Sequence, residues 1–349
     1  FKKEVVATIP IDALSSKAPL YEREWTKKKA TKNKINLNDL KKIKFEEAFI
    51  KVISSPNHSN KKWVTEQYDQ MVMGDTIERT GSNAAIIKIH NKEKAIAVTV
   101  DSSANYCKSH PLSGGKQIVC ESWRNLISVG AKPIAITNCL NFGNPENPEV
   151  MGEFAENILG IKEACEFLDY PVVSGNVSFY NGTNKKNIYP TPVIGGVGLI
   201  NDLTKKTSHQ FKKENSIILL VGKTFGHLEQ SVFLEEVHSI FEGLPPEVNL
   251  MNEKNNGESV LEIIKSNLVD SVHDISNGGL IVALAEMTMG SNYGVKIDKP
   301  KKLKNLYEYF FGEDQSRYIL EINKNNLEKV EKILKNNNIF YENIGFTQK

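Results

Sequence analysis

Residues 133–173 read PIAITNCLNFGNPENPEVMGEFAENILGIKEACEFLDYPVV and hold the clearest structural pattern in the chain. Residues 133–137 are a short apolar strand, and a polar stretch with several turn-forming residues follows it. Apolar side chains then recur at steps of three and four over residues 154–168, which predicts an amphipathic helix. Residues 172–173 enter a second strand. This strand–helix–strand order predicts an α/β or α+β domain rather than a helix bundle.

Further elements flank this unit in the sequence. Two apolar runs at residues 84–89 and 95–100 predict a β-hairpin. Residues 115–129 predict a helix, and Gly130 stands where a helix C-cap is expected. Another strand is expected at residues 193–200, and a short surface helix at residues 40–53.

A polar stretch at residues 201–215 separates a second unit of the same kind. Its strands are expected at 216–221, 271–275, 318–322 and 339–346, and its helices at 280–287 and 327–334. Residues 243–257 contain two prolines and two glycines and are interpreted as a loop. We therefore expect a linker and connecting segment (1–65), a first domain (66–208) and a second domain (209–349).

The charge balance excludes some classes of partner. The 349 residues include 44 basic and 42 acidic ones, so the formal net charge is +2, which gives no reason to expect nucleic acid or a membrane as the main partner. The basic run at 26–34 (TKKKATKNK) is interpreted as a solvated connector, with a phosphate-seeking arm as the alternative. The longest apolar run, residues 280–285, is too short to span a bilayer.

The four cysteines indicate a reducing compartment. They are Cys107, Cys120, Cys139 and Cys165, and none has CxxC spacing or a nearby histidine that completes a zinc pattern. We predict reduced, buried or half-buried thiols in a cytoplasmic protein.

Two polar motifs follow strands of the first domain. Residues 137–146 (TNCLNFGNPE) are dense in asparagine and predict either a ligand-binding lip or an ordinary turn. Residues 174–181 (SGNVSFYN) include Gly175, which allows close backbone approach to a ligand. Asn176 and Ser178 lie two apart and would point to one side of an extended strand, where an amide oxygen and a hydroxyl suit Mg²⁺ and a phosphate. A β-bulge with capping polar groups is the alternative.

Two more motifs lie in the second domain. Residues 273–280 (HDISNGGL) combine a strand end, a glycine-rich turn and a helix start, a geometry that favours an anion. The alternative is that Ser276 or Asn277 caps the helix. Residues 311–317 (FGEDQSR) are either a solvated turn with a local ion pair or part of a ligand pocket.

Taken in this order, the four motifs resemble the second half of phosphoribosylformylglycinamidine synthase, of the type built as a separate large subunit. Residues 10–25 (PIDALSSKAPLYEREW) resemble the linker after the first half of that family. Residues 63–75 (WVTEQYDQMVMGD) resemble the entry to its second half, and residues 114–125 (GGKQIVCESWRN) match as well. The resemblance covers nearly the whole chain.

The resemblance implies both a fold and a reaction. The fold is an aminoimidazole ribonucleotide synthetase-like N-terminal domain, whose sheet joins a partner sheet, followed by a ferredoxin-like C-terminal α/β domain. In the reaction, the γ-phosphate of ATP activates the amide oxygen of formylglycinamide ribonucleotide. Ammonia then displaces phosphate to give the amidine, ADP and phosphate.

The resemblance also implies roles for four residues. Asn138 and Gly175 would contact ATP, Asn176 would supply an oxygen to Mg²⁺, and Ser178 would bind the substrate. The family usually has an aspartate where this chain has Asn138, so the charge at that contact is lost. The catalytic histidine and most ATP and Mg²⁺ ligands would belong to the first half, so no catalytic residue is expected here.

The implied partners are the N-terminal half of the same polypeptide, a glutaminase subunit and a small bridging subunit. Phe1 stands in place of an initiator methionine, which favours a fragment. A sheet face that the first half would cover would also favour a homodimer of the fragment. Two alternatives stay open: another member of the superfamily, similar to selenophosphate synthetase or thiamine-phosphate kinase, and a non-catalytic nucleotide-binding scaffold.

Overall fold

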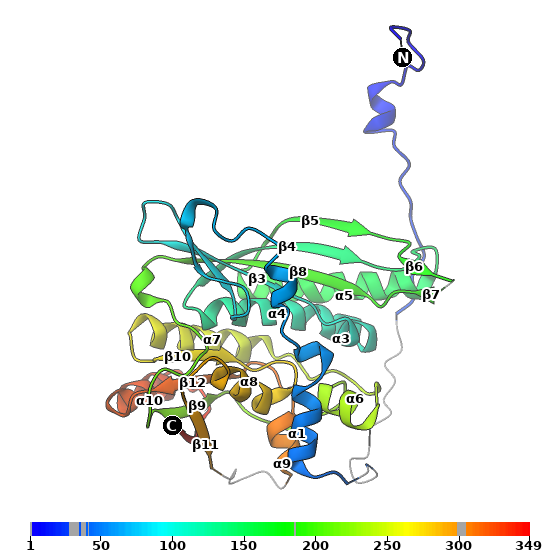
Figure 1. The fold of residues 1–349 in the computed structure, drawn as a ribbon. Coiled ribbons are helices and arrows are strands. Elements are labelled where there is room, and N and C mark those ends of the chain that lie inside the picture. The colour runs from blue at the N-terminus through cyan, green and yellow to red at the C-terminus, as the bar shows by residue number, and fades with distance from the viewer. Residues whose placement is uncertain (1, 28–34, 36–39, 41, 185, 299–304) are drawn as a thin grey trace.

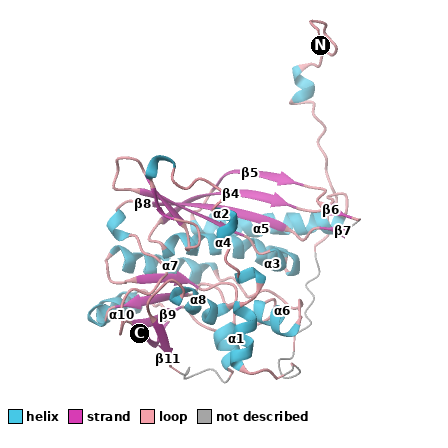
Figure 2. Cartoon of the chain, viewed as in Figure 1, coloured by secondary structure: helices cyan, strands magenta, loops and turns pink. Residues whose placement is uncertain are grey.

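The computed structural model describes the chain apart from residues 1, 28–34, 36–39, 41, 185 and 299–304 (Figure 1). Most of the basic run at 26–34 therefore lies outside the described residues. Two sheets enclose a central helical layer, which Figure 2 shows between strands above and below it. Within the described residues, no helix is both long and apolar enough to cross a membrane.

The first sheet contains the strand–helix–strand unit that the sequence predicts. Its six strands follow the order β1-β2-β3-β8-β4-β5. Their bounds are β1 Thr76–Glu78, β2 Ala85–Lys88, β3 Ala95–Asp101, β4 Lys132–Asn141, β5 Val172–Ser178 and β8 Thr191–Ile200. The β2–β3 hairpin is confirmed, and β4 and β5 pair in parallel through the crossover helix α5 (Pro148–Leu168). The other pairings in this sheet are antiparallel.

Helices cover one face of this sheet. The predicted helix at 115–129 is α4 (Pro111–Ser128). It packs along α5, and the short helix α3 (Ala104–Ser109) also packs against it. Gly130 follows α4 with a φ of 85°, the left-handed conformation expected of a residue that ends a helix. A two-stranded ribbon of β6 (Gly182–Thr183) and β7 (Lys186–Asn187) follows β5.

The second sheet is antiparallel throughout, in the order β10-β12-β9-β13-β11. The bounds are β9 Ile217–Val221, β10 Ser271–Asp274, β11 Gly294–Ile297, β12 Tyr318–Ile322 and β13 Tyr341–Gln348. Two strand–helix–strand units interlock in it: β9 and β10 joined through α7 (Leu250–Lys265), and β12 and β13 joined through α10 (Leu327–Asn336). This is the ferredoxin-like arrangement, so the predicted fold class is confirmed.

The loop expected at residues 243–257 is wrong in its second half, because α7 begins at Leu250. Gly257 lies inside this helix, where a Cβ would overlap the ring of Trp123. The glycine therefore provides room for a large side chain from the first domain and does not break the helix. The sequence did not predict this helix because two prolines, two glycines and few apolar residues in 243–257 are typical of a loop.

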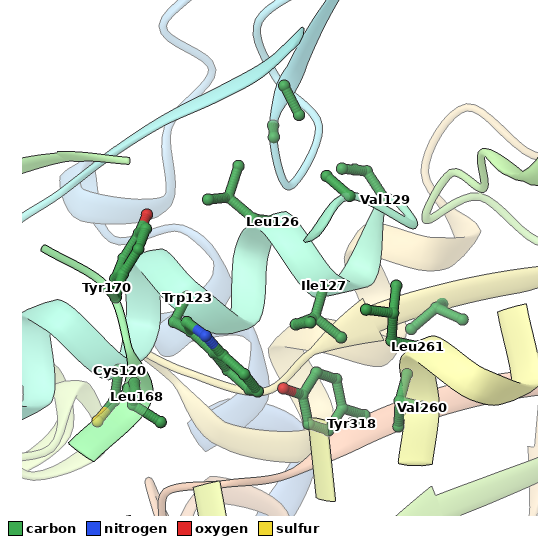
Figure 3. Close-up of a cluster of buried hydrophobic side chains, with 14 of the residues drawn as sticks. Cys120, Trp123, Leu126, Ile127, Val129, Leu168, Tyr170, Val260, Leu261 and Tyr318 are labelled. Carbon is green, nitrogen blue, oxygen red and sulfur yellow. The ribbon is translucent and has the colours of Figure 1, made fainter. Parts of the chain in front are cut away.

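One hydrophobic core joins the two domains. Side chains of α4 meet those of α7 and β12, as the labelled residues Trp123, Ile127, Val260 and Tyr318 show (Figure 3). At the junction the order is therefore first sheet, helices of the first domain, helices of the second domain and second sheet. Among the described residues, the long helices α4 and α5 that pack on the first sheet lie on its inner side, and its outer face, which we call the helix-free face, carries no α-helix of comparable length (Figure 2).

Helices α8 (Gly279–Thr288) and α9 (Leu306–Phe311) pack on the other side of the second sheet. The surface helix expected at 40–53 is shorter, α1 (Phe45–Ile53), and it packs against α6 (Val232–His238). Its Ala48 and Val52 are buried with Phe233 and Phe311. Part of the predicted linker is therefore built into the second domain.

Candidate functional site: the β4–β5 edge

The parallel pairing of β4 and β5 places the four predicted site residues on two neighbouring strands. Asn138 is opposite Gly175, Cys139 is opposite Asn176, and Asn141 is opposite Ser178. The expectation that Asn138 lies in a loop after a strand at 133–137 is wrong, because β4 continues to Asn141. Pairing with both β5 and β8 extends the strand through its polar residues.

Asn138 and Gly175 touch across the two strands. A Cβ on Gly175 would overlap Oδ1 of Asn138 and lie 2.8 Å from its carbonyl oxygen. Glycine therefore makes room for the Asn138 amide, a close approach that any larger residue would prevent. The amide lies on the same face as α5 and lines a groove of about 390 Å³ with Ile161, Cys165 and Tyr170.

Asn176 and Ser178 lie on the opposite, helix-free face of β5, because neighbouring residues of a strand alternate between faces. The prediction that they share a side agrees with the extended conformation of β5. Asn176 is exposed, and within the described residues its side chain makes no hydrogen bond. The Ser178 hydroxyl is partly buried and lies 3.1 Å from Nδ2 of Asn181. Asn138 and Gly175 therefore lie on one face of the two strands, and Asn176 and Ser178 lie on the other.

The site contains few groups for a metal ion. The described residues include no cluster of three or more His, Cys, Asp or Glu side chains that could hold one. Mg²⁺ in phosphate-transferring sites is commonly bound by one or two carboxylates together with substrate phosphates. Asn176 therefore fits Mg²⁺ as one oxygen ligand among several, with the remainder coming from elsewhere.

The segment after Asn141 is an ordered turn. Asn144 Oδ1 accepts the backbone N–H of Glu146, and Asn147 Oδ1 accepts that of Glu149 at the start of α5, each at 2.9 Å. Their side chains are used locally, so the turn interpretation holds for Asn144, while Asn147 lies just after the motif. Asn138 and Asn141 are the part of the motif that belongs to the strand.

The glycine-rich turn at residues 273–280 does form a helix N-terminus, but the chain fills it with its own carboxylate. Oε1 of Glu313 accepts the N–H groups of Gly278 and of Val232, both at 2.8 Å. The capping alternative is wrong, since Gly278 is the N-cap of α8 and no side chain caps it. The anion favoured at this helix start is therefore internal.

The interpretation of residues 311–317 as a solvated turn is wrong, because Glu313, Asp314 and Arg317 are buried. Asp314 Oδ2 accepts the N–H groups of Phe225 and Gly226 at 2.9 Å. Burial raises the pKa of Glu313 to about 7, although hydrogen bonds from Tyr106 and two backbone N–H groups oppose the shift. Asp314 also lines a pocket of about 270 Å³ with Phe225.

A buried charged cluster at the domain junction was missed. Arg124 of α4 is fully buried and contacts Glu253 of α7 at 2.8 Å, with Asp274 of β10 at 3.8 Å. Burial raises the pKa of both carboxyls, and Arg124 opposes the rise. Glu253 lies 129 residues further along the chain, so no local signal marks the pair.

Comparisons with known proteins agree with this geometry. Residues 81–200 match the model of the AIR synthase related protein, N-terminal domain, and residues 213–349 match the model of its C-terminal domain. The phosphoribosylformylglycinamidine synthase subunit PurL of Pelagibacter ubique is 51% identical over 99% of the chain and 47% of its own length. The same subunit of Nitrobacter hamburgensis is 44% identical over 99% of the chain and 46% of its own length.

Solved structures share the fold. T. maritima PurL complexed with AMPPCP has a TM-score of 0.63 at 23% identity and aligns with 100% of the chain and 49% of its own length. The chain spans about half the length of the relatives it matches. Because the two family models together cover well over half of the sequence and their order matches the two domains observed, the chain belongs to the AIR synthase related protein family.

Proposed function

We propose that this chain is one half of an ATP-dependent phosphoribosylformylglycinamidine synthase, the ligase of purine biosynthesis that makes an amidine from an amide. The paired placement of Asn138, Gly175, Asn176 and Ser178 on β4 and β5 carries the proposal. The names of the relatives support it over a selenophosphate synthetase-like or thiamine-phosphate kinase-like activity.

Each residue has a role that its position permits. The Asn138 amide and the backbone at Gly175 would contact ATP at β5, the edge strand of the first sheet, so that the triphosphate would reach Asn176 around that edge. The Ser178 hydroxyl would hold formylglycinamide ribonucleotide on the helix-free face. An amide side chain at position 138 can donate or accept a hydrogen bond but lacks the charge of the aspartate usual in the family. We therefore expect Asn138→Asp to change ATP affinity.

These groups position reactants and do not move protons. The substrate amide oxygen attacks the γ-phosphorus of ATP, and ADP leaves. Ammonia then adds to the activated carbon, phosphate departs with the former amide oxygen, and a proton is released. Phosphoryl transfer depends mainly on alignment and charge neutralisation, which a glycine backbone, an amide and a hydroxyl can assist. The base must come from another part of the enzyme.

Asn176 would hold one coordination position of a Mg²⁺ ion. When bound, such an ion neutralises phosphate charge. The missing carboxylate ligands, the catalytic histidine and the remaining ATP contacts would come from the N-terminal half of the same polypeptide. We also place the enzyme in the cytoplasm, with ammonia supplied by a glutaminase subunit through a small bridging subunit.

The test uses a chimera in which this chain replaces the matching 346 residues of the 51% identical Pelagibacter ubique relative. The assay measures amidine formation from formylglycinamide ribonucleotide, ATP and ammonia. Loss of one charge-assisted contact costs about 1.5–3 kcal/mol, so Asn176→Ala and Ser178→Ala should each lower kcat/KM by roughly 10- to 100-fold. Asn176→Ala should act chiefly on the KM for magnesium–ATP, and Ser178→Ala on the KM for the ribonucleotide.

Asn255→Ala is the matched control, because Asn255 is exposed on α7, away from β5. It should leave both constants unchanged. An active chimera in which Asn176→Ala and Ser178→Ala behave like the control would overturn the site assignment. An inactive, folded chimera that binds magnesium–ATP equally with and without Asn176 would favour the scaffold alternative.

A further inference from the structure

The N-terminal segment displays apolar side chains that nothing in the described chain covers. Residues 5–25 include Leu20, 96% exposed, and Val5, 83% exposed. The full set of large exposed apolar residues is Val5, Val6, Ile9, Ile11, Leu14, Leu20, Tyr21 and Trp25. Such a concentration in one short segment marks an interaction surface.

The segment is anchored at its downstream end. The N–H of Thr26 donates to the carbonyl of Pro148 at the start of α5, at 3.1 Å. Gly152 of α5 lacks the Cβ that would overlap the carbonyl oxygen of Thr26. Nη2 of Arg23 lies 3.4 Å from the Tyr180 hydroxyl, close after β5. The segment therefore starts from the edge of the first sheet, beside the candidate site.

From this anchor the segment rises past the ribbon of β6 and β7, on the side of the first sheet away from α4 and α5 (Figure 1). That side is the helix-free face of the sheet. Its exposed apolar residues are Ile87, Ile96, Val100 and Ile134, with Val100 69% exposed. Two uncovered apolar surfaces thus lie on the same side of the molecule: the outer face of the first sheet and the extended segment 5–25.

A large folded partner explains both surfaces. Ordering an extended segment costs about 1–2 kcal/mol per residue, so the partner must bury many of its apolar side chains. The relatives are about twice as long as the match, and a region in the same polypeptide docks at a high effective concentration. A separate chain lacks that advantage.

We infer that residues 5–25 form a strap that binds the region present in the longer relatives and unmatched here, next to its contact with the helix-free face of the first sheet. The inference rests on the proposed function, since both require that region. The strap would hold this chain and the unmatched region together at the β5 edge, next to Asn176 and Ser178, where that region would supply the remaining Mg²⁺ ligands and ATP contacts.

Hydrogen–deuterium exchange on the isolated chain and on the chimera tests the strap. Amides of residues 5–25 should exchange at least tenfold more slowly in the chimera. Ile9→Asp combined with Ile11→Asp should restore fast exchange in the segment, because two charges would enter an apolar contact. Met251→Asp, at a 53% exposed position on α7, is the matched control and should change nothing.

The outcomes separate this inference from the proposed function. An active chimera whose segment exchanges as fast as in the isolated chain would overturn the strap alone. Slow exchange in an inactive chimera would support the strap and count against the function. Concentration-dependent protection in the isolated chain would show a second copy as the partner and overturn the assignment. If the chimera does not fold, hydrogen–deuterium exchange is measured instead on the unmodified relative, over the segment that aligns with residues 5–25.

Discussion

Replacement of Arg124 by methionine tests how the two domains are joined. The Arg124 guanidinium is fully buried, lies 2.8 Å from Glu253 Oε1 and donates to Gln315 Oε1 at 3.2 Å. Removing one partner of a buried ion pair typically costs about 3–5 kcal/mol, because the other charge stays buried without compensation. We expect a loss of that size for Arg124→Met, measured as the free energy of unfolding in urea.

The pH dependence gives the sharper test. Burial already raises the pKa of Glu253 above its unfolded value, and Arg124 is the main group opposing the rise. Without Arg124 the folded-state pKa rises further. A carboxyl with a raised folded pKa gives its full stability below the unfolded pKa and loses it as pH rises through the folded value. The cost of Arg124→Met should therefore grow from pH 5 to pH 8.

Adding Glu253→Gln to Arg124→Met is the matched control. The double variant removes the uncompensated charge, so it should recover part of the lost stability and flatten the pH dependence. A loss below about 1 kcal/mol for Arg124→Met, equal at pH 5 and pH 8, would refute the view that this pair joins the domains.

Two further variants test the junction from other directions. Glu313→Gln keeps the shape of a side chain whose folded pKa is about 7 and whose ordinary value is 4.5. The free energy of unfolding, measured in urea, should then fall less between pH 4.5 and pH 7 than in the unmodified chain. An equal fall in both proteins would contradict this assignment. Gly257→Ala adds a methyl group that would overlap the Trp123 ring. Overpacking costs about 1–3 kcal/mol and exceeds the helix-propensity gain of about 1 kcal/mol, so the free energy of unfolding should fall. Asn255→Ala in the same helix should change it little.

The repeating patterns of apolar residues predicted most elements, and the motifs carried the resemblance to the family. The spacing of side chains over residues 154–168 reflects the helical period itself, so α5 could be placed without its neighbours. The hairpin of β2 and β3 was predicted from two short apolar runs, and the strand β12 was expected at the same residues that the structure gives it. The candidate residues 138, 175, 176 and 178 were named from motifs and resemblance, before their pairing was known.

Tertiary structure decided what those patterns leave open. The polar end of β4 is a strand because β5 and β8 pair with it, and that pairing puts Asn138 and Asn176 on opposite faces. The helix α7 continues through Gly257, where the absence of a Cβ leaves room for the Trp123 ring. The sequence by itself determined the local elements, since these depend on neighbouring residues, and its motifs in order carried the resemblance to the family. Burial of residues 313–317 and the Arg124–Glu253 pair depend on contacts between distant segments, which only the packed fold creates.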